Sequence, residues 1–174
     1  MPEAASTGTT DREAGPISVL VVEDQLLLRR SLSSLIRHEP GLHLAGEAAD
    51  GAEAVELARA VRPDVVLMDI RMPGMDGLTA TRHICADPTL TGTRICVLTM
   101  FELDEYVTEA LRSGASAFAL KDLDPDELLA VIRRVHAGDP WLAPSVLRRV
   151  MDRLVSRRHA PEPAATFESA DILA

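Results

Sequence analysis

Five residues that can do chemistry directly follow short apolar runs of this chain. Glu23 and Asp24 come after VLVV, and Asp69 comes after VVLM. Thr99 follows ICVL and Lys121 follows AFAL. Dense apolar runs of this length are typical of parallel strands that are buried on both faces. Because ligands of such sheets bind beyond the carboxyl ends of the strands, we expect three carboxylates, one hydroxyl and one ammonium at one rim.

This set of groups favours phosphoryl transfer assisted by a divalent cation. Neighbouring carboxylates repel one another, and Mg²⁺ can offset that repulsion while joining the carboxylates to a phosphate. Asp69 is the best nucleophile candidate, since a carboxylate can become an acyl phosphate and the loop after it can offer a backbone carbonyl to the metal. Lys121 would pair with one phosphoryl oxygen, and the Thr99 hydroxyl would donate to another.

The elements that must position these residues alternate five times along the chain. Expected strands cover 18–22, 42–48, 65–68, 94–98 and 117–120. Expected helices cover 25–39, 52–61, 78–86, 103–112 and a stretch that begins at Asp124 and ends at Gly138. This alternation predicts an α/β fold with a doubly wound, five-stranded parallel sheet, for which we adopt the flavodoxin-like strand order. A further helix is expected at 145–158.

Composition argues against several other classes of protein. The 174 residues carry a net charge of −9 and only 3% aromatic side chains, which disfavours a stand-alone nucleic-acid binder. Cys85 and Cys96 lack zinc-like spacing, and the first turn, VVEDQLLL, lacks the glycines of a nucleotide-binding loop. Neither a membrane span nor a signal peptide is recognisable, so we expect a cytoplasmic protein without a membrane partner.

Four motifs in a fixed order resemble the receiver domain of bacterial two-component response regulators. They are VVED at 21–24, LMDIRMPGMDG at 67–77, VLTM at 97–100 and FALKD at 118–122. The resemblance covers about residues 17–138 and implies a flavodoxin/CheY-like (βα)5 fold. The phrases LTMFELDEYVTEALRSGAS and WLAPSVLRRVMDRL are similar to the NarL/FixJ (LuxR-type) subfamily.

The resemblance also implies a role for each residue that matches a family motif. Asp69 corresponds to the phosphoacceptor, and Lys121 to the lysine that contacts the phosphoryl group. Glu23 and Asp24 match the acidic pair that positions Mg²⁺, and the backbone carbonyl of Arg71 matches a further metal ligand. As in the family, the phosphodonor would be a sensor histidine kinase, and the chemistry would be limited to self-phosphorylation and self-dephosphorylation rather than enzymatic turnover.

Two further residues are implied to form the switch. Phosphorylation would draw the Thr99 hydroxyl inward, and the aromatic ring of Phe118 would rotate into the space that Thr99 leaves. The resulting change of surface would favour a homodimer. Transcription would then be controlled through a C-terminal helix-turn-helix domain, which residues 160–174 are too short to hold, so DNA would be contacted only through a domain absent from this chain.

The expected organisation has three parts. Residues 1–16 are expected to be a disordered lead-in, 17–138 the receiver domain, and 139–174 a linker helix and tail of a truncated protein. Two alternatives stay open. The chain could be a stand-alone or phosphorylation-independent receiver that acts by protein–protein binding. It could also be a phosphatase of haloacid-dehalogenase type, although such enzymes need an aspartate where Arg71 stands.

Overall fold

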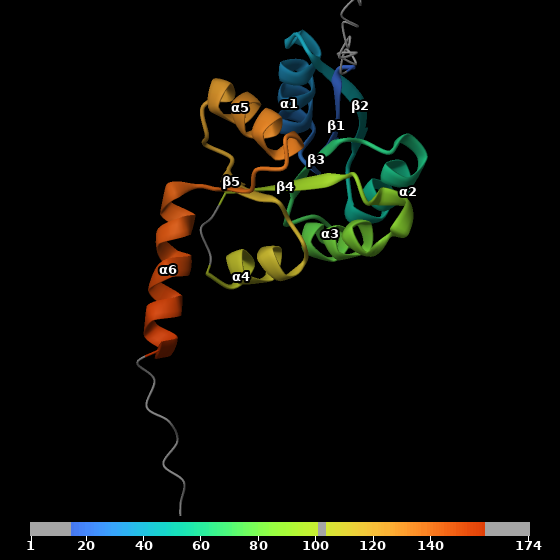
Figure 1. Cartoon of the computed structure of the whole chain (residues 1–174). Helices are drawn as coiled ribbons and strands as arrows, with labels where there is room; N and C mark the ends of the chain where they lie inside the picture. The colour runs from blue at the N-terminus through green and yellow to red at the C-terminus, as the bar shows by residue number, and fades with distance from the viewer. Residues whose placement is uncertain (1–14, 101–103, 159–174) are drawn as a thin grey trace, which may run out of the picture.

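The computed structural model describes residues 15–100 and 104–158 (Figure 1). Its strands are β1 (Ile17–Val22), β2 (Leu42–Ala48), β3 (Val65–Asp69), β4 (Arg94–Thr99), β5 (Ala117–Leu120) and β6 (Trp141–Leu142). Its helices are α1 (Leu26–His38), α2 (Gly51–Val61), α3 (Gly77–Ala86), α4 (Asp104–Arg112), α5 (Pro125–His136) and α6 (Pro144–Arg158), with a short 3₁₀ helix η1 (Pro88–Leu90) before β4.

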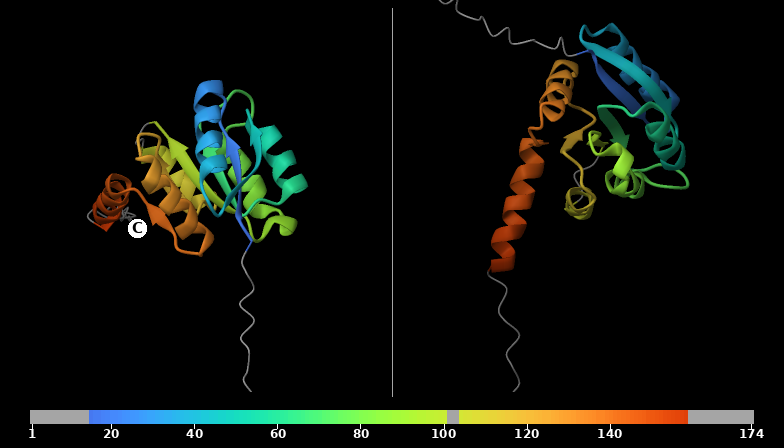
Figure 2. Two further views of the ribbon diagram at one scale, coloured as in Figure 1. Left: turned by 90° about the horizontal axis from the view of Figure 1, so that it is seen from above. Right: turned by 45° about the vertical axis from the view of Figure 1, so that its right-hand side comes forward.

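The six described strands form one parallel sheet with the order β2-β1-β3-β4-β5-β6. Helices α1 and α5 cover one face, while α2, α3 and α4 cover the other (Figures 1 and 2). This arrangement confirms the predicted α/β, doubly wound fold class. It also supplies the strand order, which the residues alone left open.

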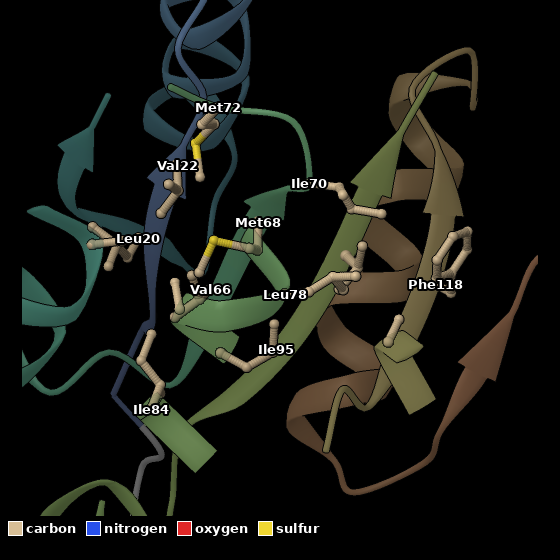
Figure 3. Packing of buried hydrophobic residues seen from close by; sticks show 14 of the residues in the cluster. Leu20, Val22, Val66, Met68, Ile70, Met72, Leu78, Ile84, Ile95 and Phe118 are labelled. Carbon is tan, nitrogen blue, oxygen red and sulfur yellow. The ribbon is translucent and has the colours of Figure 1, made fainter. Parts of the chain in front are cut away.

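Two apolar layers hold the helices to the sheet because the central strands are buried on both sides. Val19, Val21 and Leu67 contribute to the layer beneath α1 and α5. Leu20, Met68 and other side chains from β1, β3, β4 and β5 fill the layer toward α2 and α3, as Figure 3 shows. Burial on both faces explains why these strands read as continuous apolar runs instead of alternating patterns.

Aspartates begin three of the helices in the described part of the chain. The side chain of Asp50 accepts a hydrogen bond from Glu53 N, and that of Asp76 accepts one from Thr79 N. Asp124 caps α5 by accepting a hydrogen bond from Asp126 N, and Pro125 follows in the first turn. These caps satisfy backbone N–H groups that a helix leaves without partners, and they fix the residue at which each helix starts.

The prediction of five strands was wrong by one. Trp141 and Leu142 form β6, which pairs with Ala117 and Phe118 of β5. The backbone N–H of Ala143 then donates to the carbonyl of Phe118 at 3.0 Å. A two-residue strand is too short to give any periodic signal, so the sequence concealed it.

Several predicted segments fall partly or wholly outside the described residues. They include 1–14 of the expected lead-in, 159–174 of the expected tail, and Leu103 at the start of the predicted fourth helix. Within the described residues, none of the helices has both the length and the apolar character needed to cross a membrane.

Candidate functional site

Parallel register brings the strand-end residues to one edge of the sheet. Val22 of β1 pairs with Met68 of β3, so Glu23 and Asp69 follow side by side. On the other side of β3, Asp69 pairs with Leu98 of β4. The backbone N–H of Lys121 donates to the carbonyl of Thr99 at 2.9 Å, which places the end of β5 beside the end of β4. We call Glu23, Asp24, Asp69, Thr99 and Lys121 the rim site.

The chain's only lysine lies between two of the rim-site carboxylates. Lys121 Nζ is 2.7 Å from Glu23 Oε2 and 3.1 Å from Asp69 Oδ1. The side chains of Lys121 and Asp69 are each 7% exposed, and that of Glu23 is 1% exposed. One ammonium therefore compensates two buried carboxylates, an arrangement that is costly to break because an unpaired buried charge would remain.

Burial and charge act against each other on these groups. Burial raises the pKa of Asp69 above its ordinary value, and the nearby charge of Asp24 adds to the rise, while Lys121 opposes it. The pKa of Glu23 is also raised, mainly by burial and against the hydrogen bond from Lys121. For Lys121, burial lowers the pKa, but the hydrogen bond to Glu23 and the charge of Asp69 outweigh it and leave the pKa raised. The site therefore holds more negative charge than its one ammonium neutralises.

The three acids of the rim site have the geometry of a cation site. Carboxylate oxygens of Glu23, Asp24 and Asp69 all lie within 4.8 Å of one another. Asp24 is exposed and borders a surface depression of about 450 Å³, whose lining also includes Arg71, Asp76 and Glu109. An all-oxygen donor set that opens to water suits Mg²⁺, which keeps part of its hydration shell. Lys121 contacts both Glu23 and Asp69, and Gln25 N donates to Glu23, so the exposed Asp24 is the acid most open to such an ion.

Phe118 belongs to the apolar layer toward α2 and α3, and Thr99 ends the strand β4 at the rim. Thr99 lies two residues after Val97, which packs in the same layer as Phe118. Thr99 is 6% exposed at the end of β4. Phe118 pairs with Val97 and is fully buried, so it lies below the rim in the core and is not part of the rim itself (Figure 3).

Three residues that the sequence reasoning did not single out hold the rim in shape. A Cβ placed on Gly77 would lie 1.7 Å from the Asp69 carbonyl oxygen, so only glycine allows the loop to close against β3. Arg29 of α1 donates to the Glu23 carbonyl at 2.8 Å, and Gln25 N donates to the Glu23 side chain. Gly77, the last residue of the motif MPGMDG, was the one available signal, because the contact of Arg29 with Glu23 follows no local sequence pattern.

The family model described as "Response regulator receiver domain" matches residues 19–133. The transcriptional regulatory protein LiaR of Bacillus subtilis is 39% identical over 153 residues, which are 88% of this chain and 70% of LiaR. The nitrate/nitrite response regulator protein NarL of Escherichia coli K12 is 35% identical over 128 residues, 74% of this chain and 58% of NarL. The chain thus spans only part of these relatives.

Solved structures agree with this match. A LuxR-family two-component response regulator from Aurantimonas superposes with a TM-score of 0.74 at 33% identity, covering 81% of this chain and 99% of that one. The signal receiver domain of the putative response regulator NarL from Mycobacterium tuberculosis gives a TM-score of 0.66 at 32% identity, covering 71% of this chain and 98% of that one.

Proposed function

This chain belongs to the response regulator receiver domain family, in its NarL/LuxR group, and we propose that Asp69 is the phosphoacceptor through which it acts as a signalling switch. The observation that supports the proposal most is the contact of Lys121 with both Asp69 and Glu23 at a buried, acidic rim. The carboxylate of Asp69, which would be the nucleophile, is already in contact there with the ammonium of Lys121, which could pair with a phosphoryl oxygen.

The reaction would be a simple displacement at phosphorus. A carboxylate oxygen of Asp69 forms the new P–O bond, and the bond to the donor breaks, either the P–N bond of a phosphohistidine on a sensor kinase or the P–O bond of an acyl phosphate. Lys121, now 3.1 Å from Asp69 Oδ1, would transfer its hydrogen bond to a phosphoryl oxygen.

Mg²⁺ is the cofactor that we propose for this site. Glu23, Asp24, Asp69 and the backbone carbonyl of Arg71 would hold it, with Asp24 on the solvent-exposed side. When bound, the ion would neutralise the charge that gathers on the phosphoryl oxygens. Its support is the donor set of three clustered carboxylates beside a single lysine, which leaves negative charge to offset.

The signal would leave the rim through Thr99 and Phe118. A phosphoryl group adds roughly −1.5 to −2 charges and three acceptor oxygens, to which the Thr99 hydroxyl can donate. Movement of Thr99 would alter the core around Phe118, whose carbonyl accepts from Ala143 N and whose cluster includes Val146 of α6. The linker helix would thus respond directly to the switch residue, with a coupling of about 1–3 kcal/mol.

The partners follow from the same proposal. We propose a sensor histidine kinase as donor, a homodimer as the phosphorylated form, and transcription control through a DNA-binding domain outside this chain, as the name of the relative LiaR suggests.

A phosphorylation-independent receiver that acts by protein binding is the alternative. Catalytic turnover is disfavoured because Arg71 replaces the aspartate that a phosphatase of haloacid-dehalogenase type would need, and steady release of phosphate from a small ester would contradict this.

The test is phosphorylation by acetyl phosphate in the presence of Mg²⁺, followed by intact-mass analysis. Wild type should gain one phosphoryl group, and Asp69→Asn should gain none. Asp122→Asn is the matched control, because Asp122 is an exposed acid next to Lys121. Normal phosphorylation of Asp69→Asn would exclude Asp69 as the acceptor. Light scattering of the same samples tests the dimer, which should form in wild type and fail to form in Asp69→Asn.

A further inference from the structure

A groove between α4 and α6 lies away from the rim site. We define the α4–α6 groove by six of its lining residues, which are Leu111, Arg112, Val150, Arg153, Leu154 and Arg157. It encloses about 210 Å³. Arg153 Nη1 donates to Thr108 Oγ1 of α4 at 2.7 Å, which ties the middle of α6 to α4. In Figures 1 and 2, α6 extends beyond the sheet and its helices.

The groove is bordered by uncovered apolar side chains. Val146 in the first turn of α6 is fully buried, but Leu154 in the groove is 59% exposed. Met151 and Val155 of α6, which do not line the groove, are 58% and 57% exposed. Leu111 of α4 faces the same groove and is 39% exposed. Apolar surface gathered at a groove in this way marks a binding surface more often than a solvated one.

Charge narrows the choice of what covers this surface. The groove's charged lining consists of three arginines, and α6 carries five arginines against one acid, Asp152. A second copy of α6 laid along the first would bring like charges together, which is unfavourable. The complementary occupant is a segment that combines acidic and large apolar side chains and carries no basic ones.

The chain itself contains such a segment shortly after α6. Residues 159–174 include no lysine or arginine, and they carry the acids Glu162, Glu168 and Asp171 together with the apolar residues Phe167, Ile172 and Leu173. The groove residues of α6 lie between Val150 and Arg157, so the most distant of them is about 12 Å of helix before Arg158. A few extended residues after Arg158 are enough to run back over that distance.

We propose that residues 162–173 fold back onto the α4–α6 groove of their own chain. The three acids would pair with Arg112, Arg153 and Arg157, and the apolar side chains would cover Leu111 and Leu154. The short connection makes this contact intramolecular, at an effective concentration on the order of millimolar, so a weak contact is sufficient. This proposal does not depend on phosphorylation of Asp69.

Paramagnetic NMR on the full chain tests the contact. A nitroxide is attached at Ser169→Cys in a Cys85→Ser background, since Cys96 is fully buried. A ¹⁵N-labelled, spin-labelled chain diluted into unlabelled protein should lose amide signal at 108–112 and 150–157, and keep it along β2 at 42–48. Unchanged signals at the groove would overturn the proposal. Loss seen only when the spin label and the ¹⁵N label are on different chains would assign the groove to a second copy and overturn it as well.

A charge swap tests the pairing that we propose. Arg157→Glu should restore the groove signals, and adding Glu168→Arg to it should bring the signal loss back. Arg148→Glu makes the same charge change on the same helix at an exposed position that does not line the groove, and it should leave the signal loss intact. Equal effects of Arg157→Glu and Arg148→Glu would contradict a specific contact. Shifts of groove amides on adding short duplex DNA, without any signal loss from the spin label, would identify nucleic acid as the occupant instead.

Discussion

The rim site and α6 distribute charged and apolar side chains in opposite ways. At the rim, Glu23, Asp69 and Lys121 are almost fully buried and paired with one another. On α6, the arginines are exposed, and so are Met151 and Leu154. A buried charge is stable only when a nearby group of opposite charge or a hydrogen bond compensates it, so the stability of the rim depends on the contacts among these three side chains. The later turns of α6 have few such constraints, and substitutions there should change binding rather than stability.

The largest effect is expected at Gly77. Gly77→Ala would place a Cβ 1.7 Å from the Asp69 carbonyl oxygen, a clash with backbone that no side-chain rotation relieves. We expect a loss of more than about 4 kcal/mol of unfolding free energy, measured by urea denaturation. Gly92→Ala is the matched control, because a Cβ there meets nothing within 4 Å and the change should be nearly neutral. Similar stability of the two variants would disprove the tight closure of the loop on β3.

The next largest effect is expected at Lys121. Lys121→Met leaves two buried carboxylates without their cation, which should cost about 3 kcal/mol at pH 7. Because the pKa values of Glu23 and Asp69 are raised, the deficit relative to wild type should shrink as the pH falls from 7 toward 5. The pKa of Lys121 is raised above 10.5 in the folded protein. The stability that its charge contributes should therefore be complete below pH 10.5 and lost as the pH rises through the raised folded pKa.

Urea titrations of wild type and Lys121→Met at several pH values check this expectation. Added Mg²⁺ should restore part of the variant's stability, because it would replace the missing positive charge. A deficit that is independent of both pH and Mg²⁺ would mean that Lys121 acts through packing and not through its charge.

A smaller contrast is expected within α6 itself. Val146→Ala removes methyl groups from a fully buried side chain in the cluster that contains Phe118 and should cost about 2 kcal/mol. Val155→Ala makes the same change where the side chain is 57% exposed and should stay within about 0.5 kcal/mol of wild type. Equal costs in thermal or urea denaturation would show that the first turn of α6 is not part of the receiver core.

The smallest effect is expected at a surface ion pair. Hydrogen bonds from Arg59 and Thr89 lower the pKa of Asp87 from 3.8 to about 2. A lowered folded pKa means that the stabilisation is complete above pH 3.8 and is lost as the pH falls through about 2. Arg59→Gln should move the ¹³C carboxyl titration of Asp87 back toward 3.8. A midpoint unchanged by that substitution would remove Arg59 as the cause.

Much of the rim site could be predicted because it depends on a simple rule. Residues after buried parallel strands meet at one edge, so Glu23, Asp24, Asp69 and Lys121 could be brought together from the sequence alone. The contact between Lys121 and Glu23 could not, because strands buried on both faces show no alternation that assigns a side chain to a face. The strand β6 was missed because a pair of residues carries no periodic signal, and its pairing with Phe118 places the linker beside the expected switch residue.

The single lysine of this chain offers the most direct measurement on the rim site. Selective ¹³C labelling of lysine gives one side-chain Cε resonance, which reports on Lys121 alone. Our account predicts that acetyl phosphate with Mg²⁺ shifts this resonance in wild type and in Asp122→Asn, and leaves it unmoved in Asp69→Asn. A protein that gains one phosphoryl group by mass while its Lys121 resonance stays in place would contradict the account, because the phosphoryl group would then lie away from the rim.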